Sequence, residues 1–177
     1  MKSGVMLSTV EHLLSALYGS GVDNAIIEVD SLEIPILDGS SRQWVELIRQ
    51  VGIVELPAKR PYLKVLKRVE VTEKNRKMSI EPAEGFEITC EIDFNHPMIG
   101  VQQHEISFRV ADYSLEIAPA RTFGFVEEIE MLKQNGLARG GSLENAIALT
   151  RDGFLNPEPL RFADEFVRHK ILDIIGD

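Results

Sequence analysis

The stretch RFADEFVRHKILDIIGD (161–177) closes the chain and has the pattern of one amphipathic helix. Successive residues of a helix are turned by about 100°, so His169 and Asp173 lie about 40° apart on one side, with Phe162 and Phe166 nearby. A side that faced only water would seldom carry two phenylalanines beside its charges. We therefore expect another part of the protein or a ligand to cover it. The opposite side collects the aliphatic residues Val167, Ile171, Ile174 and Ile175.

A second helix is predicted near the start of the chain, over residues 8–21, STVEHLLSALYGSG. His12 is expected on the side away from its apolar stripe, next to Glu11. Two simpler interpretations stay open here. Ser8 and Glu11 match a capping box, in which Glu11 reaches back to the Ser8 amide, and His12 could be an ordinary exposed histidine. The apolar stripe itself consists of Val10, Leu13, Leu14 and Leu17.

Taken together, the two helices offer the protein ligands of an open metal site. Two histidines, His12 and His169, with one carboxylate, Asp173, are the ligand set of a tetrahedral zinc ion that keeps its fourth position for water. Glu11, adjacent to a ligand, could be the base for that water. Two alternatives remain open. The same set describes the facial triad of iron(II) oxygenases, and His169 with Asp173 could be a simple i,i+4 pair worth a few tenths of a kcal/mol.

Composition places the chain among globular proteins and limits its partners. Its 177 residues are 44% apolar and 27% charged, which allows one medium domain or two small ones. The net charge of −9 argues against nucleic acid or an anionic membrane as partner. The sequence contains one cysteine, Cys90, no apolar run long enough for a membrane span and no apolar core of a signal peptide. We therefore expect a cytoplasmic protein.

Hydrophobic periodicity predicts the α+β class. A proline-containing linker over 56–61 separates two halves, each with strands and helices, and Cys90 is expected on the apolar side of a half-buried strand. Besides the two helices above, we predict helices over 40–52, 111–118 and 126–136, a glycine-rich loop over 136–142, and strands over 24–30, 32–37, 62–71, 77–82, 85–94, 104–110 and 145–150.

Several of these segments together resemble one family. The segments are STVEHLLSAL (8–17), IPILDGS (34–40), DFNHP (93–97), ARTFGF (120–125), GGS (140–142) and FVRHKILDIIGD (166–177). In this order, over nearly the whole chain, they resemble the zinc-dependent deacetylase of lipid A synthesis, UDP-3-O-acyl-N-acetylglucosamine deacetylase. The resemblance implies that the protein hydrolyses the N-acetyl group of a UDP-linked, acylated glucosamine and releases acetate.

The resemblance also implies a role for individual residues. His12, His169 and Asp173 would bind Zn²⁺, and Glu11 would be the general base. Thr122 would help to hold the carbonyl oxygen as it becomes an oxyanion. Asp177 would be a carboxylate that orients a catalytic histidine. Contacts to the substrate would come from Phe123, Lys170, Gly141 and Ser142.

The family fold implied by the resemblance has two similar α+β lobes, each a mainly antiparallel sheet with helices, and the helices pack face to face between the two sheets. The lobes would comprise residues 1–57 and 58–177, and an insert over 123–142 would form a passage for the acyl chain. Its apolar surface would come from Phe123, Phe125, Ile129, Met131, Leu132 and Leu137, although for any one of them ordinary core packing is an equally good explanation.

Two departures from the family pattern qualify this prediction. Family members have strands before the STVEHL segment, and they continue beyond IGD to a catalytic histidine. His96 and His104 lie in the wrong segments to replace it. We therefore expect a chain that is shortened at both ends, and the alternative function is a catalytically impaired fragment that retains only metal or substrate binding.

Overall fold

A computed structural model gives the fold and describes residues 6–108, 112–127 and 142–177. It confirms the α+β class. The helices are α1 (Glu11–Gly19), α2 (Arg42–Val51), α3 (Tyr113–Glu116) and α5 (Glu165–Gly176). The strands are β1 (Val69–Glu73), β2 (Arg76–Ile80), β3 (Glu87–Phe94), β4 (Gly100–Ser107), β5 (Phe123–Phe125) and β6 (Ile147–Leu149).

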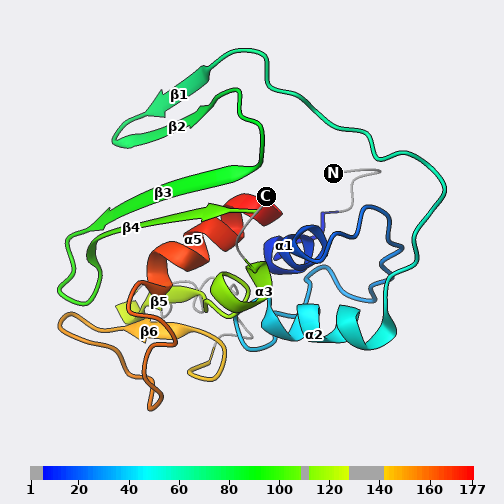
Figure 1. Cartoon of the computed structure of the whole chain (residues 1–177). Coiled ribbons are helices and arrows are strands. Elements are labelled where there is room, and N and C mark those ends of the chain that lie inside the picture. The colour runs from blue at the N-terminus through cyan, green and yellow to red at the C-terminus, as the bar shows by residue number, and fades with distance from the viewer. Residues whose placement is uncertain (1–5, 109–111, 128–141) are drawn as a thin grey trace.

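The strands pair in three small sheets. β1 with β2 and β3 with β4 are antiparallel hairpins, while β5 and β6 are parallel neighbours. Along β3, exposed residues alternate with buried or half-buried ones, and Cys90 lies on the more buried side, as predicted. The β1–β2 hairpin is exposed along its whole length. Figure 1 shows it away from the helices.

Helix α5 connects the parts of the molecule. It packs against β3 and β4 on one side and against α1 on another, and in Figure 1 its carboxyl end lies beside α1. One core cluster joins α1, α2, α3 and α5 to the β3–β4 hairpin, and a second lies where Phe166 of α5 meets β6. The predicted cover over the side of α5 that carries His169 is therefore confirmed: Phe166 and His169 are 0% and 1% exposed.

A glycine sets the close approach of α1 and α5. A Cβ atom added to Gly176 would lie 1.9 Å from the carbonyl oxygen of Glu11 and 2.9 Å from its Cα. No side chain fits between the two backbones at this crossing. The end of α5 and the start of α1 can therefore meet only because residue 176 is glycine.

The strands predicted in the first part of the chain are wrong. The strands over 24–30 and 32–37 do not form; an isolated parallel bridge between Ser8 and Glu33 is the only pairing of this segment within the described ranges. A strand needs a partner for its backbone groups, and no described strand pairs with residues 24–31. Ile26 is accordingly 95% exposed.

The capping box is also wrong, because α1 begins after Val10 and has no side-chain cap. Ser8 Oγ instead donates a hydrogen bond to the Leu32 carbonyl (3.1 Å). The expected orientation of α1 fails as well. His12 is buried, whereas Leu14 of the predicted stripe is 41% exposed. The reason is that α1 is covered by α5 and α2, so its buried side includes His12, Ser15 and Ala16 beside Leu13.

Other boundaries differ by smaller amounts. β1 covers only the end of the strand predicted over 62–71, and β4 begins before residue 104. β5 was not predicted. The helix over 126–136 and the loop over 136–142 fall mostly outside the described residues, as do Ile129, Met131, Leu132 and Leu137. The division into lobes at residues 57 and 58 and the passage over 123–142 stay predictions.

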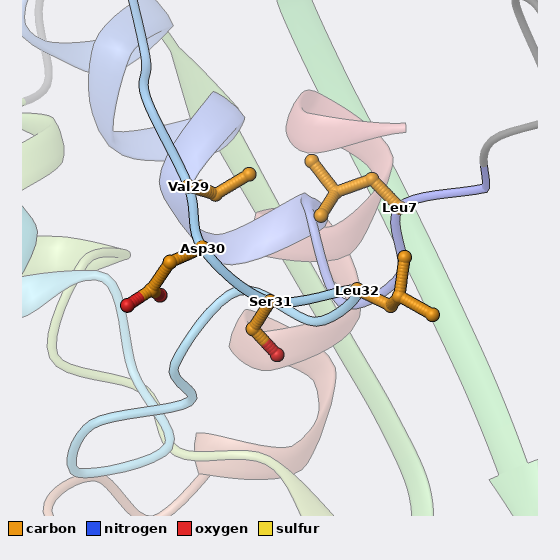
Figure 2. Close-up of a pocket in the computed structure, with 5 residues that line it drawn as sticks. All are labelled: Leu7, Val29, Asp30, Ser31 and Leu32. Carbon is orange, nitrogen blue, oxygen red and sulfur yellow. The ribbon is translucent and has the colours of Figure 1, made fainter.

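The segment without strands forms a shallow hollow on the surface. Figure 2 shows Leu7 and Val29 on opposite sides of it, with Ser31 and Leu32 below, while the Asp30 carboxylate points away. None of the predicted site residues lines it. In the described part of the chain, no helix combines the length and apolar character that crossing a membrane requires.

Candidate metal centre

His12, His169 and Asp173 come together where α1 meets α5. The Oδ1 atom of Asp173 lies 3.3 Å from Nε2 of His169 and 3.9 Å from Nε2 of His12. One ligand atom from each residue lies within 4.8 Å of the others. Two atoms that are each about 2.1 Å from one zinc ion, at the tetrahedral angle, are roughly 3.4 Å apart. The spacing therefore fits a common cation with small adjustments.

The hydrogen bond of His169 defines which of its nitrogens is free. Nδ1 lies 3.0 Å from the carbonyl oxygen of Ala120. A carbonyl oxygen can only accept, so the proton of the ring is on Nδ1 and the Nε2 lone pair faces Asp173. Two acceptors that face each other at 3.3 Å repel unless a cation lies between them. This arrangement is what a metal-binding site presents.

Burial favours the neutral form of both imidazoles, which is the form that can bind a metal ion. Burial lowers the pKa of His169 to about 4, against the opposing effect of the Asp173 carboxylate. Burial also lowers the pKa of His12, although Asp173, Glu11 and Asp38 act in the opposite direction. At neutral pH, neither ring is expected to carry the second proton that would make it repel a metal ion.

The backbone of α1 is fixed next to His12 by buried hydroxyls. Ser41, which precedes α2, donates a hydrogen bond of 2.7 Å to the His12 carbonyl. One turn further along α1, Ser15 Oγ and the Tyr113 hydroxyl are 2.7 Å apart. Nδ1 of His12 is buried and has no hydrogen-bond partner among the described residues. The position of His12 therefore comes from helix packing and backbone contacts.

Lys170 and Phe123 lie at the edge of this centre. The Lys170 ammonium donates to Oδ2 of Asp173 at 2.8 Å, which leaves Oδ1 facing the two histidines. The same ammonium lies 5.3 Å from the centre of the Phe123 ring, and that ring is 6.5 Å from the His169 ring. The predicted substrate contacts Lys170 and Phe123 are thus neighbours of the metal ligands.

For the other predicted site residues within the described ranges, the structure shows a position but no hydrogen bond or ion pair with the side chains of the three candidate ligands. Glu11 is the first residue of α1, half-buried and next to His12. Thr122 precedes β5, and its N–H donates to the Gly39 carbonyl at 2.7 Å. Asp177 is exposed. Ser142 is exposed in a turn where its N–H donates to Asn145 Oδ1 at 2.8 Å, and Gly141 lies outside the described residues.

Sequence patterns did not single out two ion pairs that lie close to the centre. Glu165 and Arg121 form a buried pair at 2.9 Å, and Arg161 binds Asp38 at 3.0 Å. Asp38 belongs to the Asp-Gly turn signal of the sequence, but nothing in that signal indicates that its carboxylate acts on His12. The partners of each pair are too far apart along the chain for spacing rules to connect them.

These observations define a class: an α+β protein with a buried candidate metal centre of two histidines and one carboxylate at a helix crossing. A family model described as UDP-3-O-acyl N-acetylglycosamine deacetylase matches residues 1–177. The chain belongs to this family, and the resemblance inferred from its sequence segments is confirmed.

Curated relatives agree with the family model. The chain is 50% identical to a UDP-3-O-acyl-N-acetylglucosamine deacetylase of Myxococcus xanthus, over 99% of this chain and 56% of the relative. Proteins of the same name from Aliarcobacter butzleri and a Psychrobacter species are 48% and 49% identical, over 99% and 100% of this chain and 59% and 60% of their own lengths. The chain therefore spans a little over half the length of the relatives it matches.

Proposed function

We propose that this chain carries the zinc centre of a hydrolase that removes the N-acetyl group from UDP-3-O-acyl-N-acetylglucosamine and releases acetate, in lipid A synthesis. The observation that carries the proposal is the Asp173 oxygen that faces the Nε2 atoms of His12 and His169. Family membership supports the reaction and substrate class. The single cysteine and the predicted cytoplasmic location are compatible with it.

His12, His169 and Asp173 would hold the ion. When bound, Zn²⁺ lowers the pKa of a water ligand to about 7 and polarises a carbonyl group. Zinc is favoured over iron(II) because Glu11, a carboxylate beside a ligand, serves as a base in hydrolysis and has no evident use in oxygen activation.

The remaining residues would act on the proton and on the substrate. Glu11 would take the proton from the attacking water, and Thr122 would help to hold the amide oxygen as negative charge develops on it. Lys170 and Phe123, which lie beside Asp173 and His169, would contact the substrate. Gly141 and Ser142 would contribute further substrate contacts, and Asp177 would be a supporting carboxylate.

A second candidate is a module that binds metal or substrate without turnover. The observation that favours it is the chain's span of 56–60% of its relatives. General acid–base groups typically contribute about 10²–10⁴-fold to a rate, so a group contributed by the rest of a longer protein could account for most of the activity.

Acetate release from UDP-3-O-acyl-N-acetylglucosamine tests both candidates. This chain should be compared with a version extended to the length of the relatives, and with Glu11→Gln in the extended version. The hydrolase proposal predicts zinc-dependent release in the extended version and a loss of about 10²-fold or more with Glu11→Gln. If Glu11→Gln does not change the rate, the role of Glu11 is refuted. Equal rates in the short and extended chains would refute the second candidate.

A further inference from the structure

Glu165 is a fully buried carboxylate for which the proposed chemistry has no direct use. It lies in the first turn of α5 and is 0% exposed. An ionised carboxylate is costly to bury unless hydrogen bonds compensate its charge. A negative charge is favoured in the first turn of a helix, but that effect alone is too small to explain complete burial. The contacts of Glu165 therefore indicate what it does.

Its oxygens accept four hydrogen bonds. Oε1 accepts from the Arg121 backbone N–H (3.0 Å) and from Nε of the same arginine (2.9 Å). Oε2 accepts from Nη2 of Arg121 (3.1 Å) and from the Arg161 backbone N–H (2.6 Å). The guanidinium is further held by the Pro159 carbonyl, 2.9 Å from Nη2. Glu165 thus binds both the side chain and the main chain of Arg121.

The main-chain contact links Glu165 to the metal centre. The N–H of Arg121 and the carbonyl of Ala120 belong to the same peptide group. Its N–H donates to Glu165, and its carbonyl oxygen accepts from Nδ1 of His169 at 3.0 Å. Residues 165 and 169 are one turn apart and lie on the same side of α5. One peptide group therefore bridges two side chains of a single helix and has one orientation that satisfies both.

The negative charge of Glu165 favours one orientation of this peptide group. A carboxylate that accepts from a peptide N–H draws the peptide toward its charge-separated form, so the carbonyl oxygen becomes a stronger acceptor. A reversed peptide would point a carbonyl at the carboxylate and an N–H at His169, which is unfavourable at both ends. The carboxylate thus favours the orientation in which His169 keeps its proton on Nδ1.

We propose that Glu165 is a positioning residue for the metal centre: through the Ala120–Arg121 peptide it fixes the ring orientation and tautomer of His169, so that Nε2 faces the cation position. Carboxylates that act directly on a ligand histidine are common at zinc sites. Here the carboxylate acts through an intervening peptide group. The inference rests on the proposed metal site, but its first consequence, the tautomer of His169, can be measured without metal.

The alternative is that Glu165 and Arg121 form a structural ion pair with no effect on His169. Arg121→Lys separates the two explanations, because it removes the guanidinium fork and retains the backbone N–H that belongs to the bridge. Glu165→Gln removes the charge that orients the peptide. Asn156→Ala is a matched stability control: it removes a buried amide whose Oδ1 accepts from the Ala148 N–H (2.8 Å) and whose Nδ2 donates to the carbonyls of Leu143 and Ala146.

The experiment records long-range ¹H–¹⁵N spectra of the histidine rings in metal-free protein and measures zinc dissociation constants by competition with a chelator. The chain has four histidines, and His169 is assigned by its loss in His169→Gln. We expect His169 to be protonated on Nδ1 in the unaltered chain. Glu165→Gln should weaken the Nδ1–H hydrogen bond, seen as an upfield proton shift, and raise the zinc dissociation constant about tenfold. Arg121→Lys should change the hydrogen bond and the zinc dissociation constant less than Glu165→Gln does. Asn156→Ala should change neither of them.

Two results would overturn the proposal. One is a His169 proton on Nε2 in the unaltered chain, which needs no variant and applies even if Glu165→Gln fails to fold. The other is a Glu165→Gln protein that folds with the His169 spectrum and zinc affinity unchanged. The proposed function fails differently: the unaltered chain, with His169 protonated on Nδ1, would bind no zinc.

Discussion

Helix α5 and the segment over residues 24–32 both contain apolar side chains, but most of those on α5 are buried and those of the segment are exposed. On α5, Phe166 and Ile171 are 0% exposed and His169 is 1% exposed. In the segment, Ile26 is 95% and Leu32 69% exposed. Burial of apolar area is the main source of folding free energy. The region that stabilises the fold is therefore also the region that positions the candidate metal ligands.

The largest expected effect comes from a core side chain of α5. Phe166 packs edge-to-face against Phe123, with ring centres 5.0 Å apart. Phe166→Ala should reduce the free energy of unfolding by about 3–5 kcal/mol, because it removes a buried ring and leaves a cavity. Urea unfolding followed by circular dichroism measures this. A loss below about 1 kcal/mol would mean that this core does not support the fold.

The next largest effect is the pH dependence of stability that the buried His169 of α5 is expected to cause. The pKa of His169 is about 4 in the folded chain and near 6.5 when unfolded, so the unfolded state binds a proton that the folded state excludes. The contribution of His169 to the free energy of unfolding should be fully present above pH 6.5, and the free energy should fall by about 3 kcal/mol toward pH 4. The measurement is urea unfolding of metal-free protein at each pH. His169→Asn should flatten the dependence, and an equally steep curve in that variant would refute the assignment.

The sequence predicts the structure of α5 better than that of residues 24–37. The 3.6-residue pattern predicts α5 and the cover over Phe166 and His169, and the family resemblance brings His12 to the same site. Local pattern fails for residues 24–37, where strand-like alternation has no described neighbour to pair with. It also could not find Glu165 or Ala120, because their roles depend on a peptide group that becomes adjacent to His169 only in the folded chain.

Gly176 offers a smaller and more specific test of the crossing. Helix propensity alone predicts that Gly176→Ala gains up to about 1 kcal/mol. The overlap of its Cβ with the Glu11 backbone predicts the opposite, a loss of about 1–3 kcal/mol, together with weaker zinc binding because α1 must move. Thermal unfolding and a zinc titration decide the sign. Gly153→Ala is the control, since its Cβ would meet only Thr150 Oγ1 at 3.8 Å.

The smallest effect is expected in the exposed segment. Ile26→Ser should change the free energy of unfolding by less than about 0.5 kcal/mol, because the side chain is already in water. Zinc affinity should be unchanged. If urea unfolding shows a loss comparable with that of Phe166→Ala, the exposed segment contributes to stability as much as the core around α5 does.

If two helices that are far apart in sequence bind one cation, the purified chain should retain zinc after equilibration with Zn²⁺ and removal of the excess. We expect about one ion per chain and its loss in both His12→Ala and Asp173→Ala. The ion should be retained in His104→Gln, because His104 pairs with Asp164, the residue before α5, and is not one of the proposed ligands. Folded His12→Ala and Asp173→Ala proteins that keep the zinc content of the unaltered chain would show that α1 and α5 do not share a cation.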